Sequence, residues 1–156
     1  MDFSGKKPRD HLTLGVMYQE IGSCDDAIVE LSKVLALDPA NKAAHLYIGM
    51  AYRDKGFFEE ARIHFEKVLE TGGDVPAACA GLASVLLARR RYDEALEFAR
   101  KSTRLRSDYV PGHLITGDIY QALGEHEIAL LKYEKVLSLD PQHVHAHYRS
   151  SISYRN

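Results

Sequence analysis

The residues best suited to chemistry in this sequence are histidines, and they recur at a fixed spacing. One column, in which each member follows the previous one at the same interval, consists of His11, His45, Cys79, His113 and His147. Imidazole and thiolate groups are common zinc ligands, so the column could indicate a metal site. If the spacing reflects stacked helices, however, neighbouring axes lie roughly 8–10 Å apart, whereas each zinc ligand must lie about 2 Å from the ion. We therefore interpret the column as packing residues, and predict no metal and no cofactor.

Two further histidine patterns are incomplete. His143 and His147 are four residues apart and would share a helix face, but no third ligand accompanies them. The segment Gly124-Glu125-His126-Glu127 begins like the H-E-x-x-H motif of zinc proteases, yet Leu130 stands where the second histidine is required. Neither glycine-rich phosphate-binding motif occurs, and neither cysteine has an activating arrangement. The sequence predicts no catalytic residue and no enzyme.

A basic segment is the remaining candidate for chemistry. It contains seven cations, Arg89, Arg90, Arg91, Arg100, Lys101, Arg104 and Arg106. Such a cluster could bind an acidic partner or a phosphate backbone. Interleaved acids (Asp93, Glu94 and Glu97) favour a solvated helix flank instead. With a formal net charge of −2 and a pI of about 6.4, the chain is not expected to bind nucleic acid.

The elements that position these residues repeat at the same interval as the histidine column. In the first copy, His11, Leu14, Gly15 and Tyr18 are spaced as one face of a helix. A turn and a second helix follow, and this second helix carries an alanine at the same position in every copy: Ala27, Ala61, Ala95 and Ala129. The small residue at the Gly15 position allows close helix approach, and we expect the recurring alanine opposite it. Gly22, Gly56 and Gly124 mark the turns, with Arg90 as the exception.

This pattern resembles the tetratricopeptide repeat, which has a period of roughly 34 residues. The motif of that family has x2-L-G-x2-Y in the first helix and A-x3-F and P in the second. The first copy reads His11-x2-Leu14-Gly15-x2-Tyr18, then Ala27-x3-Leu31 and Pro39. The third copy departs most, with Leu86, Ala99 and Ser107 at the tyrosine, aromatic and proline positions. The resemblance implies an all-α fold, a right-handed alpha-alpha solenoid of four stacked helical hairpins plus a C-terminal capping helix.

The repeat boundaries define the expected organisation. We predict a flexible N-terminal tail at 1–7 and one repeat domain over 8–156, with repeats at about 8–41, 42–75, 76–109 and 110–143 and a cap helix at 144–156. Ser150-Ser151 replaces the usual apolar-small pair and favours a solvated cap. Tyr154, in the repeat position, is also consistent with a longer array.

The resemblance further implies that the first helix of each repeat lines a concave groove. The residues one step round from the packing face are therefore expected to meet a partner. They are Leu12, Val16, Gln19, Leu46, Met50, Arg53, Ala80, Ser84, Leu87, Leu114, Asp118, Gln121 and Tyr148, with Ile152 beside the last. The first half of this set is apolar, which favours a partner that covers it.

The family's groove for the acidic carboxylate tail of heat-shock chaperones needs lysine and asparagine in the first helix and lysine with arginine in the third. Leu12, Val16, Ala77 and Gly81 occupy those positions, so this ligand is not expected. The sequence instead predicts a non-catalytic scaffold or adaptor that binds a protein or peptide ligand. The alternatives are a self-associating building block and the substrate-recruiting arm of a larger enzyme. No apolar run is long enough to span a membrane and no signal peptide is evident, so we expect a cytoplasmic protein.

Overall fold

A computed structural model describes residues 7–73 and 75–154 of the 156-residue chain. Over these ranges it contains nine α-helices and no strand, which confirms the predicted all-α repeat fold. The chain divides into two compact units, Met1–Asp74 and Val75–Asn156. Of the predicted N-terminal tail only Lys7 is described, and the last two residues of the predicted cap also lie outside the described residues.

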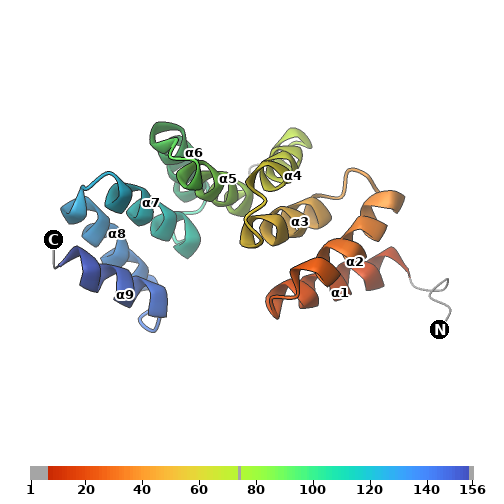
Figure 1. Ribbon diagram of the computed structural model, residues 1–156, viewed down its shortest axis with the longest axis horizontal. Helices are drawn as coiled ribbons and strands as arrows, with labels where there is room; N and C mark the ends of the chain where they lie inside the picture. Colours follow the sequence, from red (N-terminus) through yellow and green to blue (C-terminus); the bar gives the residue numbers. More distant parts are fainter. Residues whose placement is uncertain (1–6, 74, 155–156) are drawn as a thin grey trace. The chain divides into compact units, whose positions relative to one another are not determined.

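Each unit is built from antiparallel helical hairpins (Figure 1). The first unit contains α1 (Pro8–Glu20), α2 (Cys24–Leu37), α3 (Lys42–Asp54) and α4 (Phe58–Glu70). The second unit contains α5 (Pro76–Ala88), α6 (Tyr92–Leu105), α7 (Val110–Ala122), α8 (His126–Leu139) and α9 (Val144–Ser153). Helices α1, α3, α5, α7 and α9 begin at equal intervals along the chain, so the sequence period is also the structural period. None of the described helices has the length and apolar character needed to cross a membrane.

Local signals explain where the helices begin and turn. Proline occupies the first turn of α1, α5 and α7, where its missing N–H costs nothing. The Asn41 side chain accepts a hydrogen bond from the Ala44 N–H and caps α3. Between the helices of a hairpin the chain passes through the left-handed region, at φ 81° for Gly56. Arg90, the exception in the sequence, adopts the same conformation at φ 60°.

The glycines of the first helices are required by close contact with the second helices. A Cβ atom placed on Gly15 would lie 2.4 Å from Leu31 Cγ, and one on Gly49 would lie 2.9 Å from Phe65 Cε1. A Cβ atom on Gly117 would lie 2.5 Å from Tyr133 Cε1. The recurring alanines Ala27, Ala61 and Ala129 are also fully buried in these second helices. The atoms nearest the small position belong to the bulky residue one helical turn after that alanine.

The apolar core of each unit follows these contacts. In the first unit, Ala27, Leu31 and Val34 of α2 pack with Ala44 and Ile48 of α3. In the second unit, α5, α6 and α7 supply the core cluster, which comprises Ala83, Leu86, Ala95, Leu96, Ala99, Ile115 and Ile119. Within each unit, the second helix of one hairpin thus packs on the first helix that follows it. This leaves another face of each first helix for a different role.

Candidate functional site

All predicted groove residues lie on first helices. α1, α3, α5 and α7 contribute three each, and α9 contributes Tyr148. Most are half-buried, whereas Ala80 is buried and Tyr148 is 66% exposed. Because the chain divides into two compact units, we describe the predicted groove residues as two separate sets. We call the α1 and α3 set the first wall and the α5, α7 and α9 set the second wall.

The first wall is mainly apolar. Leu12 and Val16 on α1 and Leu46 and Met50 on α3 are all half-buried, and α1 contacts α3 directly. Leu12 also packs against the core of the unit, which fixes its position. Half-exposed aliphatic side chains on two adjoining helices form a surface that a nonpolar partner can cover.

Polar residues mark one edge of the first wall. The Gln19 Nε2 of α1 donates to Asp54 Oδ2 at the end of α3, at 2.8 Å. Arg53, the remaining predicted residue of α3, forms two hydrogen bonds to the other carboxylate oxygen of Asp54. Buried Gln19 Oε1 has no hydrogen-bond partner. This edge joins α1 to α3 and gives the apolar surface a polar boundary.

The second wall contains an ion pair. Arg149 Nη1 of α9 lies 2.6 Å from Asp118 Oδ1 of α7, and the Tyr133 hydroxyl donates to the same oxygen at 3.0 Å. Ser153 of α9 also donates to Gln121 Oε1 of α7, at 2.6 Å. A pocket of about 240 Å³ adjoins this network, lined by Gln121, His145, Tyr148, Arg149 and Ile152. The structure thus brings Asp118, Gln121 and Tyr148 to one place.

The remaining residues of the second wall expose less side-chain surface than Tyr148 does. Ala80 is 7% exposed, and Leu87 packs against the core cluster of the unit. Ser84 and Leu114 are half-buried. α5 and α7 are adjacent, as α1 and α3 are. The first two positions on α5 bear smaller side chains than their equivalents on α3, Leu46 and Met50.

Burial determines the electrostatics of Asp118. Burial raises the pKa of this carboxyl, while the charge of Arg149 and the hydrogen bond from Tyr133 act in the opposite direction. The pKa of the Tyr133 hydroxyl is raised by burial and by the neighbouring Asp118. The hydroxyl therefore stays protonated at neutral pH and donates its proton to the carboxylate. Through Asp118, Tyr133 and Arg149, the network joins α7, α8 and α9.

The histidine column has a structural role at three positions, two in repeats and one on α9. In each, Nε2 lies within hydrogen-bond distance of a carbonyl six residues earlier, in the preceding inter-repeat loop. The pairs are His45 with Pro39 at 3.0 Å, His113 with Ser107 at 2.8 Å and His147 with Pro141 at 2.8 Å. A carbonyl oxygen can only accept, so Nε2 carries the proton. These hydrogen bonds hold the loop before each first helix against that helix.

The first two histidines also contact their second helices. His11 Nδ1 lies 2.6 Å from Glu30 Oε2. Burial raises the pKa of this carboxyl, but hydrogen bonds from Lys33 and His11 outweigh it and the pKa is lowered. His45 Nδ1 instead lies 2.9 Å from Nδ1 of His64. In the tautomer with the His45 proton on Nε2, His45 Nδ1 accepts the hydrogen bond and His64 donates it from Nδ1.

His64 is the more perturbed partner of that pair. Burial, together with the nearby His45, lowers its pKa to about 4. Its ring also lies 5.7 Å from the ring of Tyr52. Among the described residues, no group of three or more histidine, cysteine or carboxylate side chains is arranged to hold a metal ion. The His45–His64 pair accordingly offers two ligands and not a complete site.

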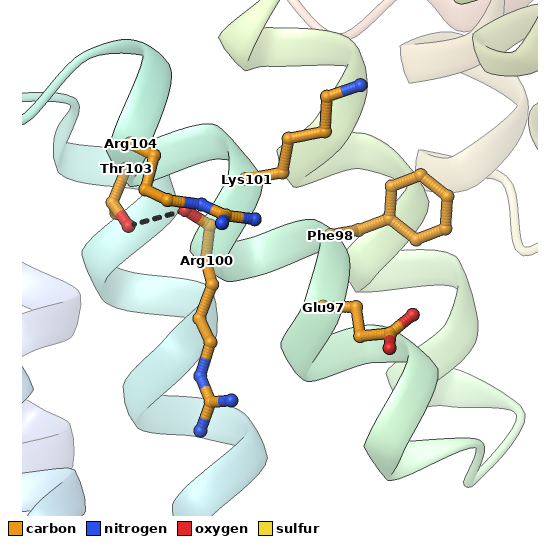
Figure 2. Close-up of a pocket in the computed structure, with 6 residues that line it drawn as sticks. All are labelled: Glu97, Phe98, Arg100, Lys101, Thr103 and Arg104. Carbon is orange, nitrogen blue, oxygen red and sulfur yellow. Dashed lines mark hydrogen bonds between the residues drawn. The ribbon is translucent and has the colours of Figure 1, made fainter.

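Three cations of the basic segment, Arg100, Lys101 and Arg104, line a pocket on α6 (Figure 2). Its volume is about 550 Å³, and it is lined by Glu97, Phe98, Arg100, Lys101, Thr103 and Arg104. Arg100 Nη2 also donates to the Tyr120 hydroxyl at 3.1 Å. Near the start of the helix, Arg91 forms a two-pronged pair with Glu94. Acidic and apolar groups thus share this surface with the cations.

Arg149 is the site residue that sequence reasoning missed. It fills a column otherwise made of Thr13, Tyr47, Gly81 and Ile115, and Asp118 is likewise the only charged member of its own column. Opposite charges confined to adjacent repeats are a signal of pairing. The signal is readable only when the columns are compared with one another.

The folds of both units and these walls define an all-α helical repeat protein. Models of the tetratricopeptide repeat match residues 12–76, 48–110 and 114–143, and the chain belongs to the tetratricopeptide repeat family. This membership supports a role as a protein-interaction module. No protein of curated function matches the sequence.

Solved structures with similar folds include several proteins of this family. MamA protein is 25% identical over 95% of this chain and 81% of its own, with a TM-score of 0.72. YrrB, described as a TPR protein with an unusual peptide-binding site, is 23% identical over 93% of this chain and 75% of its own, with a TM-score of 0.67. TTC0263 from Thermus thermophilus is 17% identical over 97% and 83%, with a TM-score of 0.82. The latter two likenesses concern the fold alone.

Proposed function

We propose that this protein is a non-catalytic adaptor whose first wall binds an apolar stretch of a partner, either an amphipathic helix or an extended peptide. The observation that carries the proposal is the set of half-exposed aliphatic side chains Leu12, Val16, Leu46 and Met50 on adjoining helices. A ligand that covers them removes nonpolar surface from water at roughly 25 cal/mol per Å².

The chemistry of the first wall limits the ligand. Its centre has no cation for a carboxylate tail, since Leu12 and Val16 occupy the positions that the chaperone clamp gives to lysine and asparagine. Arg53 is at the edge and is already bonded to Asp54. Apolar side chains on the ligand should therefore supply most of the binding free energy. Met50 adds an unbranched side chain that adapts to different partners.

A displayed library of random peptides, selected on the immobilised protein, would identify ligand sequences. The affinity of an enriched peptide should fall at least tenfold in the Met50→Glu variant, because the charge would be desolvated beneath an apolar ligand. Lys101→Glu, on α6, is the matched control and should bind as the parent does. If Lys101→Glu loses binding and Met50→Glu retains it, the α6 pocket is the binding surface and this proposal is wrong.

Self-association is the other outcome that the experiment must separate. Sedimentation of the parent protein over a wide range of concentration should show one species if the first wall is kept for another protein. A dimer that Met50→Glu dissociates would assign the wall to a second copy of the chain.

A further inference from the structure

The second half of α6 is basic, whereas most acids of this helix lie near its start. From Phe98 to Ser107 the chain contains no acid and four cations, which are Arg100, Lys101, Arg104 and Arg106. Asp93 and Glu94 lie in the first turn, and Glu94 is paired with Arg91. Of the acids that favoured a solvated flank in the sequence, only Glu97 therefore lies beside the basic half.

The repeat fold does not require arginine at two of these positions. One repeat earlier, α4 has Glu66 at the position of Arg100 and Glu70 at the position of Arg104. Both of those acids pair with cations of their own helix. α6 instead places two like charges four residues apart, which weakens a helix slightly. The hairpin is thus compatible with either charge, and the positive charge of α6 is available for a ligand.

Both arginines can donate hydrogen bonds to a ligand. Arg100 and Arg104 are exposed. Arg100 Nη2 donates to the Tyr120 hydroxyl at 3.1 Å, which positions the guanidinium and leaves its other N–H groups for a ligand. Among the described residues, none forms an ion pair with the Arg104 side chain. An anion can therefore bind the two guanidinium groups without breaking an ion pair within this part of the chain.

The two ends of the α6 pocket differ in chemistry. Phe98 is half-buried and packs against the core cluster of the unit, which fixes the position of its ring. Glu97 is exposed. In Figure 2, Glu97 and Phe98 lie toward one end of the pocket, and Thr103 and Arg104 lie toward the other. The pocket thus has a carboxylate and an apolar ring at one end and a guanidinium group at the other.

We propose that the α6 pocket binds an acidic segment of a partner protein. An apolar side chain of the segment packs against Phe98, and its carboxylates bind Arg100 and Arg104. Guanidinium and carboxylate groups match in planar geometry and form paired hydrogen bonds. Glu97 repels acidic groups, so the acidic residues should lie toward the Arg104 end. The volume of about 550 Å³ is in the range of pockets that enclose small ligands, so a few side chains fit and a whole helix does not.

The charge distribution favours carboxylates over phosphates as the bound groups. A phosphate monoester carries a charge of about −1.5 to −2 at neutral pH, which is more than the single charge of a carboxylate. Glu97 shares the pocket, so it repels a phosphate more strongly. The formal net charge of −2 likewise opposes a long polyanion such as nucleic acid. Single charges spread along a peptide can avoid Glu97 and still reach both arginines.

The test uses the full chain and the fluorescence anisotropy of a labelled peptide that has one phenylalanine beside four glutamates. Parent protein should bind it saturably, and a peptide with glutamines in place of the glutamates should bind at least tenfold more weakly. Arg104→Gln should weaken binding of the glutamate peptide at least fivefold, because hydrogen bonds to a charged group are lost. Glu97→Gln should strengthen it. Lys135→Gln, an exposed change on α8 that removes the same charge, is the matched control and should bind as the parent does.

Three results would overturn the proposal. The first is no saturation by the parent protein up to about 1 mM peptide, the weak limit of specific recognition. The second is equal binding of the glutamate and glutamine peptides, or an equal loss of affinity in Arg104→Gln and Lys135→Gln. The third is tighter binding of a peptide with phosphoserines in place of the glutamates, or of a DNA duplex, which would assign the cations to phosphate. Met50→Glu should leave binding of the glutamate peptide unchanged, so this proposal and that of the first wall can fail separately.

Discussion

The second hairpin (α3–α4) and the third (α5–α6) follow the same repeat yet fill it differently. The second places Phe65 against Gly49, whereas the third has alanine at both equivalent positions, Ala83 and Ala99, each fully buried. The second also has a hydrogen-bonded histidine pair, His45 and His64, where the third has Cys79 and Phe98. The same repeat thus accommodates either a large residue against a small one or two small residues where its two helices meet.

The same two hairpins differ on the wall. Leu46 and Met50 of α3 become Ala80 and Ser84 of α5. Large apolar side chains are therefore kept at half-exposed positions in the second hairpin and replaced by small ones in the third. The comparison indicates that packing constrains one face of a first helix, while another face is free to specialise in binding. Substitutions that exchange the two hairpins test this view.

Phe65→Ala should have the largest effect on stability. The side chain is fully buried, and its truncation leaves a cavity opposite Gly49 that should lower the free energy of unfolding by about 3–5 kcal/mol. Ile63→Ala, on the same helix but 47% exposed, is the matched control. Urea denaturation measures both. A loss no larger than that of Ile63→Ala would show that the large–small contact does not stabilise the second hairpin.

The His64 pair should make stability depend on pH. The folded-state pKa is about 4 and the unfolded value about 6.5. The unfolded chain binds more protons between these values, so stability should fall as pH decreases from about 6.5 to about 4. His64→Phe, which copies Phe98 of the third hairpin, should reduce this slope. Denaturation midpoints across this range decide the matter, and an unchanged slope in the variant would contradict the assignment.

The effect of Gly49→Ala on the free energy of unfolding should change sign when Phe65 is replaced. In the parent, the new Cβ atom would lie 2.9 Å from Phe65 Cε1, and the variant should be destabilised. In a Phe65→Ala background the clash disappears, and alanine should stabilise the helix by up to about 1 kcal/mol relative to glycine. The double-mutant cycle gives the coupling directly. Additive effects would mean that Gly49 and Phe65 do not form the contact described here.

Arg90→Gly should stabilise the third hairpin. Arg90 has a φ of 60°, where a side chain is disfavoured and where the second hairpin uses Gly56. Relief of this strain should add about 0.5–1 kcal/mol to the free energy of unfolding. The reciprocal change, Gly56→Arg, should cost a similar amount. Thermal melts compare the pair, and a destabilised Arg90→Gly would show that the arginine side chain makes compensating contacts.

Much of the fold could be predicted from the sequence because the period repeats each constraint. The constant interval is enough to predict hairpins and the need for a small residue at Gly49. It is not enough to identify the partner of that residue. The facing side chain depends on how far one helix is shifted along the other, and a helical turn separates Ala61 from Phe65.

The candidate site was less predictable for a related reason. Membership of a face could be read from the spacing, so Asp118 and Gln121 were expected on the wall. Their actual partners, Arg149 and Ser153, belong to the next first helix. Similarly, the bond between His45 and the Pro39 carbonyl depends on the path of a loop. To predict a contact between repeats, one must know the register of one helix against another. The residues found at one repeat position do not give that register.

The adjacent residues Gly49 and Met50 test the central claim most directly, because one belongs to the packing face and the other to the wall. The measurement is the affinity of Met50→Glu for a library-selected peptide, made beside its denaturation midpoint. Stability should stay within about 0.5 kcal/mol of the parent, while affinity falls at least tenfold. A variant that binds as the parent does, or one that unfolds, would contradict the assignment of Met50 to an exposed binding wall.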